Sequence, residues 1–91
     1  MSAKAEISWK RVTEDGIHLQ IYARHFGGKW RFFKRQRRYD QWQEVESPPM
    51  EDWLELLDSI RRRIDRGLLG PQEEPRLIKT IREHHPEAEV S

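Results

Sequence analysis

The sequence predicts an α+β fold, in which a three- to four-stranded antiparallel β-meander precedes a long amphipathic helix and a short C-terminal helix. Apolar and polar residues alternate through the first half of the chain, whereas apolar residues recur every three or four positions in the second half. The pattern changes at Ser47-Pro48-Pro49. The long helix is expected to pack on one sheet face, because each element has an apolar side to bury.

The strand prediction rests on four segments, which are residues 6–12, 17–24, 29–36 and a shorter one at 41–46. Asp15-Gly16 and Gly27-Gly28 are typical turn sequences between strands. Because successive side chains point to opposite faces of a strand, one face is expected to be buried. That face would carry Ile7, Trp9, Ile17, Leu19, Ile21, Trp30 and Phe32.

The long helix is predicted over residues 48–66, with Ser47 as N-cap and Gly67 just past its end. A second helix is predicted over residues 75–85, with Leu77, Ile78 and Ile81 facing inward. The apolar stripe of the long helix is expected to comprise Met50, Trp53, Leu54, Leu57, Ile60 and Ile64.

The length of 91 residues suits one domain, predicted over residues 6–86, with flexible ends at 1–5 and 87–91. The chain has no cysteine, which excludes disulfides and thiolate metal ligands and favours the reducing cytoplasm. No apolar run approaches the roughly 20 residues of a membrane span. A soluble cytoplasmic protein is therefore expected.

Charge is distributed unevenly along the chain although the formal net charge is only +1. Residues 1–46 hold ten Lys/Arg and six Asp/Glu, whereas residues 47–91 hold seven and ten. Seven basic residues and no acidic residue lie between Arg24 and Arg38. The first half is thus the candidate for contact with an anionic partner.

The second sheet face is predicted to be open and to combine cations with aromatic rings. Cations neutralise phosphates, and flat rings stack on unpaired bases, so this combination favours nucleic-acid binding. A solvated basic face, or aromatic rings covered by other parts of the protein, is the alternative. The candidate contact residues on this face are Lys10, Tyr22, Arg24, Arg31, Phe33 and Arg35.

Arg37 and Arg38 extend this basic set into the loop that follows the third strand. They are predicted to contact phosphates of a single-stranded or duplex nucleic acid. Dense charge can also protect a sheet edge against aggregation, which is the competing interpretation.

Trp42 has polar neighbours on both sides and is predicted to lie half exposed on an edge strand. Exposed tryptophan is enriched at interfaces, so Trp42 could anchor a homodimer or a protein partner. Capping of the hydrophobic core is an equally good interpretation of this residue. A protein-interaction module is therefore the alternative function.

The sequence carries no signature of catalysis or of metal and cofactor binding. It lacks the GxSxG, GxxxxGK[ST], GxGxxG and HExxH motifs, and adjacent His84 and His85 point about 100° apart on a helix. We therefore predict no cofactor, no metal and no enzymatic activity.

The predicted topology resembles two classes of DNA-binding domain, without a diagnostic motif for either. A four-stranded meander followed by a helix is similar to the transcriptional-coactivator and whirly type of single-strand binder, which forms dimers. A three-stranded sheet backed by a helix resembles the arm-binding domains of phage integrases, which contact duplex DNA. Fold alone does not fix function.

Overall fold

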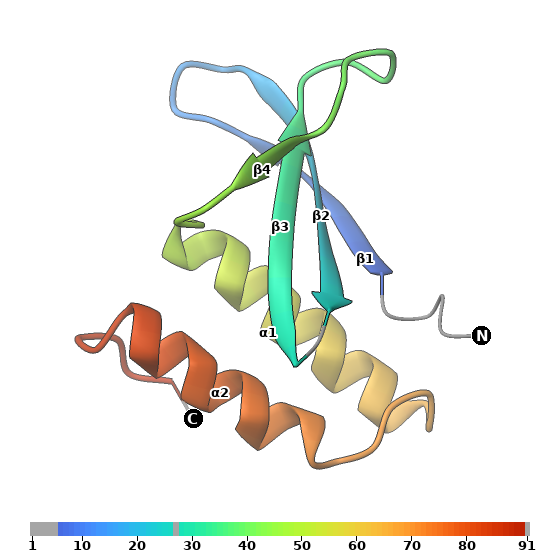
Figure 1. Ribbon diagram of the computed structural model, residues 1–91, viewed down its shortest axis with the longest axis vertical. Helices are drawn as coiled ribbons and strands as arrows, with labels where there is room; N and C mark the ends of the chain where they lie inside the picture. Colours follow the sequence, from blue (N-terminus) through green and yellow to red (C-terminus); the bar gives the residue numbers. More distant parts are fainter. Residues whose placement is uncertain (1–5, 27, 91) are drawn as a thin grey trace. The chain divides into compact units, whose positions relative to one another are not determined.

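The computed structural model describes residues 6–26 and 28–90 and has the predicted α+β class (Figure 1). A four-stranded antiparallel sheet precedes two helices. The chain divides into two compact units, Met1–Pro48 with the sheet and Pro49–Ser91 with the helices. A single domain spanning both units, and the packing of the long helix on the sheet, stay predictions. The predicted flexible residues 1–5 lie outside the described residues.

The strands follow one another in the sheet as they do in the sequence, which confirms the meander. Gly16 and Gly28 have φ angles of 84° and 82°, which glycine adopts without steric cost. The Asp15-Gly16 turn is thus as predicted, whereas Gly27 of the second turn sequence lies outside the described residues. The strands are β1 (Glu6–Val12), β2 (His18–Phe26), β3 (Lys29–Arg35) and β4 (Gln43–Val45), the last being shorter than expected.

One face of the sheet is apolar, as the alternation predicts. Ile7, Ala23 and Phe32 lie directly opposite one another on three strands, and all three are buried. Trp9 is half-buried and packs edge-on against Phe32, with ring centroids 6.1 Å apart. Leu19 and Ile21 complete the buried set on this face.

Two residues predicted for the buried face lie at its ends instead. Ile17 is 40% exposed because it belongs to the β1–β2 turn, where its N–H donates to Thr13 Oγ1 at 3.1 Å. Trp30 is only half-buried, and it stacks on His25 of the neighbouring strand at 4.7 Å. Alternation thus identifies the face of a residue but not the point at which the sheet ends.

Helix α1 comprises Met50–Asp65, so it starts later than predicted, and Ser47 does not cap it. The residue before a proline is disfavoured in helical geometry, so Pro48 is kept out of the helix by Pro49. Pro49 takes the N-cap position, and its carbonyl accepts from the N–H of Asp52 at 3.0 Å.

The apolar stripe of α1 contains Trp53, Leu56, Leu57 and Ile60, all buried. Leu54, predicted for this stripe, is 45% exposed because the 100° step per residue places it well outside the stripe. The end of the helix is as predicted.

Gly67 ends α1 in a left-handed conformation, with φ of 77°. Its N–H donates to the carbonyl of Ile64 at 3.0 Å, and the N–H of Leu68 donates to that of Arg63 at 2.8 Å. This pair of bonds is the Schellman motif, which satisfies carbonyls that the helix end leaves without partners.

Helix α2 comprises Glu73–His84, so it starts two residues earlier than predicted. Leu77 and Ile81 are buried as predicted, whereas Ile78 is only half-buried and lines a hollow on the helix surface. Arg61 of α1 donates to Glu74 at 2.7 Å, and this bond joins the two helices. In the segment predicted to be a loose tail, Val90 is buried and its carbonyl accepts from Arg82 at 2.6 Å. The flexibility of residues 87–91 stays a prediction. Neither helix has the length and apolarity needed to cross a membrane.

Candidate functional site

The second sheet face brings the predicted contact residues together. Residues that pair across antiparallel strands point to the same side, so the register assigns each residue to a face. Three rows cross the second face: Glu6, Arg24 and Arg31; Ser8, Tyr22, Phe33 and Glu44; and Lys10, Gln20 and Arg35. All six sheet residues predicted for nucleic-acid contact are in these rows.

An aromatic cluster occupies the centre of this face. The rings of Tyr22 and Phe33 are stacked, with centroids 4.8 Å apart and an interplanar angle of 17°. Trp42 lies edge-on against Tyr22 at 4.7 Å and 81°. Trp42 therefore covers part of the aromatic surface that the sequence offers to bases, and less of that surface is free for stacking.

Trp42 itself precedes β4 rather than belonging to an edge strand. Its half-buried ring is held both by Tyr22 and by Arg35, whose guanidinium carbon lies 4.2 Å from a Trp42 ring centroid. The predicted role of Trp42 at a partner interface stays a prediction. The alternative interpretation is a cap on the hydrophobic core, but the identified contacts of Trp42 are with Tyr22 and Arg35 on the second sheet face rather than with the buried apolar face.

Arg31 is engaged by an acidic neighbour. Its Nε and Nη2 donate to the two carboxylate oxygens of Glu44 at 2.8 and 2.6 Å, in the bidentate geometry that favours arginine. The hydrogen bonds from Arg31 lower the pKa of Glu44, and the same bonds raise the pKa of Arg31. Arg31 is thus less available for phosphate than the sequence suggests.

Arg24 and Arg35 also have neighbours on this face. The Nε of Arg24 lies 3.6 Å from a carboxylate oxygen of Glu6, and its guanidinium carbon lies 4.9 Å from the ring centroid of Phe26. Arg35 donates from Nε to the Gln20 side chain at 2.7 Å. Arg35 has no acidic partner in the described residues and therefore keeps a positive charge that no carboxylate offsets.

The loop between β3 and β4 is held in shape by Asp40. Its carboxylate accepts from the N–H of Arg37 at 3.1 Å, and its own N–H donates to the Arg37 carbonyl at 2.9 Å. Tyr39 lies inside this closed turn and is 79% exposed, and its hydroxyl contacts Arg37 Nη1 at 3.3 Å. The loop thus presents an exposed aromatic ring that directly follows two exposed arginines, Arg37 and Arg38, and contacts the first of them.

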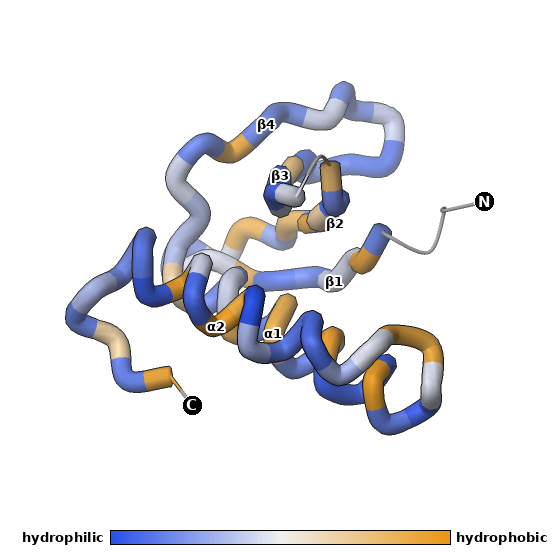
Figure 2. Tube along the Cα trace, turned by 60° about the horizontal axis from the view of Figure 1, so that its bottom comes forward, coloured by the Kyte–Doolittle hydropathy of each residue, from blue (hydrophilic) through white to orange (hydrophobic). Residues whose placement is uncertain are grey.

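The two ends of the sheet differ in charge pairing. Acidic partners hold Arg24 and Arg31 at the end near the β2–β3 turn, whereas the β3–β4 loop projects from the opposite end (Figure 1). The tube of this loop is mainly hydrophilic in Figure 2. Among the residues that the structure describes, Lys10, Lys34 and Arg38 form no ion pair. Among the described residues Lys29 also forms no ion pair, and it lies beside the β2–β3 turn. The loop end therefore holds most, not all, of the described sheet cations that have no carboxylate partner.

Sequence reasoning missed two features of this site. Tyr39 was available as a signal, because it is an aromatic residue directly after two arginines in a predicted loop tip. The pairing of Arg31 with Glu44 depends on the β3–β4 register, in which Phe33 lies opposite Glu44. That register requires the exact length of the loop, which the sequence pattern leaves open.

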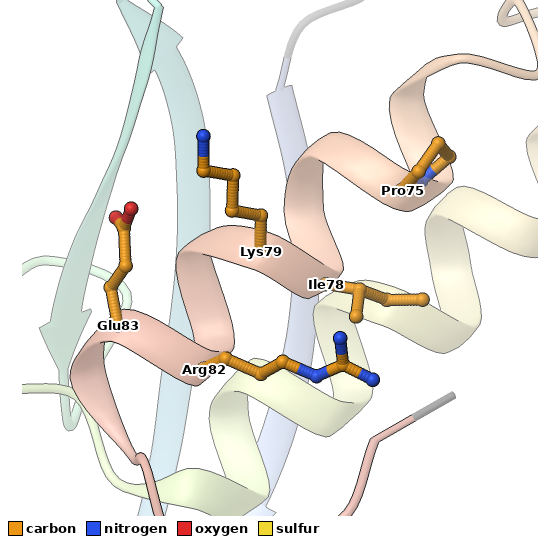
Figure 3. Close-up of a pocket in the computed structure, with 5 residues that line it drawn as sticks. All are labelled: Pro75, Ile78, Lys79, Arg82 and Glu83. Carbon is orange, nitrogen blue, oxygen red and sulfur yellow. The ribbon is translucent and has the colours of Figure 1, made fainter.

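The helical unit has a hollow of about 490 Å³ along α2, lined by Pro75, Ile78, Lys79, Arg82 and Glu83 (Figure 3). Lys79 and Glu83 point to the same side of the helix. Within residues 6–26 and 28–90, no group of three or more His, Asp or Glu side chains could hold a metal ion.

Comparison of the chain with protein-family models, with curated proteins and with solved structures found no match. The function is therefore inferred from the loop end, which is the end of the sheet from which the β3–β4 loop projects.

Proposed function

We propose that this chain binds nucleic acid, without catalysis, through the loop end of its sheet. The proposed contact set joins the arginines of the loop to Lys10 and Arg35, which lie on the second sheet face. It also includes Lys34, which pairs with Ile21 and so lies on the opposite face at the same end of the sheet. The observation that carries the proposal is Tyr39, which is 79% exposed, contacts Arg37 and follows Arg38 on a loop fixed by Asp40. Large exposed rings are costly to hold in water, and a ring flanked by cations offers both stacking and phosphate pairing.

The contact differs from the one expected from sequence alone. Arg24 and Arg31 have carboxylate partners, and Trp42 partly covers Tyr22, so these residues are assigned a supporting role. The loop end instead supplies cations that need not first break an ion pair. Release of counterions from the phosphates would provide most of the affinity.

The test is a titration of labelled oligonucleotides, read by fluorescence anisotropy at several salt concentrations. With about three phosphates neutralised, the logarithm of the binding constant should fall with the logarithm of salt with a slope of about −2 for single strands. The double variant Arg37→Gln/Arg38→Gln removes two of those contacts and should reduce the slope by about 1.4.

The matched control is Arg62→Gln/Arg63→Gln, which removes the same charge from adjacent arginines of α1. The proposal requires this control to bind nearly as the parent does. Equal losses in both double variants would show that only net charge matters, and undiminished binding by the loop variant would reject the proposed contact.

A further inference from the structure

A polar hollow of about 560 Å³ lies at the loop end of the sheet, within the first unit. Its volume is in the range of roughly 300–1,000 Å³ that is usual for small-ligand sites. Leu19 of the apolar face and Asp40 form part of its lining. Three cationic and three amide side chains form the rest: Lys34, Arg35, Arg37, Gln36, Gln41 and Gln43.

The amides of this hollow are available for a ligand. Within the described part of the chain, the side chains of Gln36, Gln41 and Gln43 make no hydrogen bond, and Lys34 forms no ion pair. The carboxylate of Asp40, which also lines the hollow, accepts from the backbone N–H of Arg37. Because the Asp40 carboxylate is engaged by the loop backbone, the cations and amides are the principal groups that could recognise a ligand.

The chemistry of these groups distinguishes one kind of nucleic acid from another. Cations alone would suit any phosphate backbone. An amide adds one acceptor and two donors on a short arm, which match the edge of a base. A paired base offers an amide only its groove edge, whereas a base can enter a hollow and present its Watson–Crick edge only when it is unpaired.

We propose that this hollow accepts one unpaired nucleotide, with its phosphate at Lys34 and Arg37 and its base edge at the amides of Gln41 and Gln43. This inference rests on the proposed function and narrows it to single-stranded nucleic acid. Tyr39, on the exposed side of the same loop, would stack on a neighbouring base of the strand.

The experiment compares a single-stranded oligonucleotide with the duplex of the same sequence, by anisotropy at one low salt concentration. The single strand should bind at least tenfold more tightly. Gln41→Leu/Gln43→Leu keeps every cation but removes both amides, and it should weaken single-strand binding about tenfold, as expected for two neutral hydrogen bonds. Its duplex affinity and its salt slope should equal those of the parent.

Gln72→Leu is the control, because Gln72 is exposed and lies in the other unit, at the start of α2. Equal affinity for both nucleic-acid forms, with no effect of the Gln41 and Gln43 changes, would overturn the nucleotide hollow and leave the proposed function standing. No binding of either form would overturn both. Weakening of single-strand and duplex binding alike by the glutamine variant would mean that the amides support the loop rather than a base.

Discussion

Replacement of Trp42 by alanine tests whether the β3–β4 loop is held on the second sheet face. The ring has two identified contacts, an edge-on contact with Tyr22 at 4.7 Å and a cation–π contact with Arg35 at 4.2 Å. An aromatic pair of this kind contributes about 0.5–1.5 kcal/mol, and a partly exposed cation–π contact about 0.5–1 kcal/mol. Together they predict that Trp42→Ala lowers the free energy of unfolding by about 1–2.5 kcal/mol.

The assay is urea unfolding followed by far-UV circular dichroism. For an m-value near 1.5 kcal/mol/M, the loss corresponds to a fall of roughly 1 M in the unfolding midpoint. Tyr39→Ala is the control, because Tyr39 lies in the same loop but is 79% exposed. Its cost should stay below about 0.5 kcal/mol, as for most surface substitutions. A double-mutant cycle with Arg35→Gln should give a coupling energy of about 0.5–1 kcal/mol with Trp42.

A Trp42→Ala variant as stable as the parent would refute this reasoning, as would a Tyr39→Ala variant that loses as much stability as Trp42→Ala. The same proteins also test the role of Trp42 in association. If Trp42 anchors a second copy of the chain, its replacement lowers the sedimentation mass while the unfolding midpoint of the monomer is unchanged. If the ring acts within the sheet unit, the midpoint falls and the mass stays constant.

Three further predictions concern other features of the structure. Gly67→Ala should cost about 1–2 kcal/mol in urea unfolding, because alanine is strained at φ of 77° although nothing lies within 4 Å of the added methyl group; an unchanged midpoint would contradict the left-handed helix end. Asp40→Ala should speed amide exchange at Arg37, whose N–H loses its acceptor, with little change elsewhere in the sheet. The NMR titration of Glu44 should give a pKa below the ordinary value of about 4.3, and Arg31→Gln should raise it again. The stabilisation from this pair is present above the unfolded-state pKa and is lost as pH falls through the lowered value.

The strand and helix pattern of this chain could be predicted because each signal is local. The alternation in residues 17–24 requires only that one sheet face be buried, and Gly67 ends α1 through its own backbone preference. The predictions were wrong where the conformation of a residue depends on residues beside it in the chain. Pro49 moved the start of α1, and the turn at Thr13 took Ile17 out of the sheet.

The sequence could predict which side chains share the second sheet face. It could not predict which of those side chains are already engaged by neighbours. Pairing of Arg31 with Glu44 and the position of Trp42 over Tyr22 both depend on how the β3–β4 loop closes, because β4 contributes only three residues to the sheet. No periodic pattern encodes that closure. The sequence pattern therefore suggests more available cations and rings at the centre of the sheet than the structure leaves there, and fewer in the loop.

A count of cations along the sequence treats every arginine as equal. In this sheet the cations fall into two classes, those with a carboxylate partner and those without one. Arg31 donates from Nε and Nη2 to Glu44, so a phosphate can reach only its remaining N–H groups, and the adjacent carboxylate would repel that phosphate. Lys34 and Arg38 have no carboxylate partner of this kind among the described residues. The proposed function therefore predicts that an anionic polymer binds at the loop end rather than beside Arg24 and Arg31. The salt slope should consequently fall by more in the Arg37→Gln/Arg38→Gln variant than in Arg24→Gln/Arg31→Gln, although each variant removes the same charge. Equal slopes would show that the ion pairs do not restrict Arg24 and Arg31.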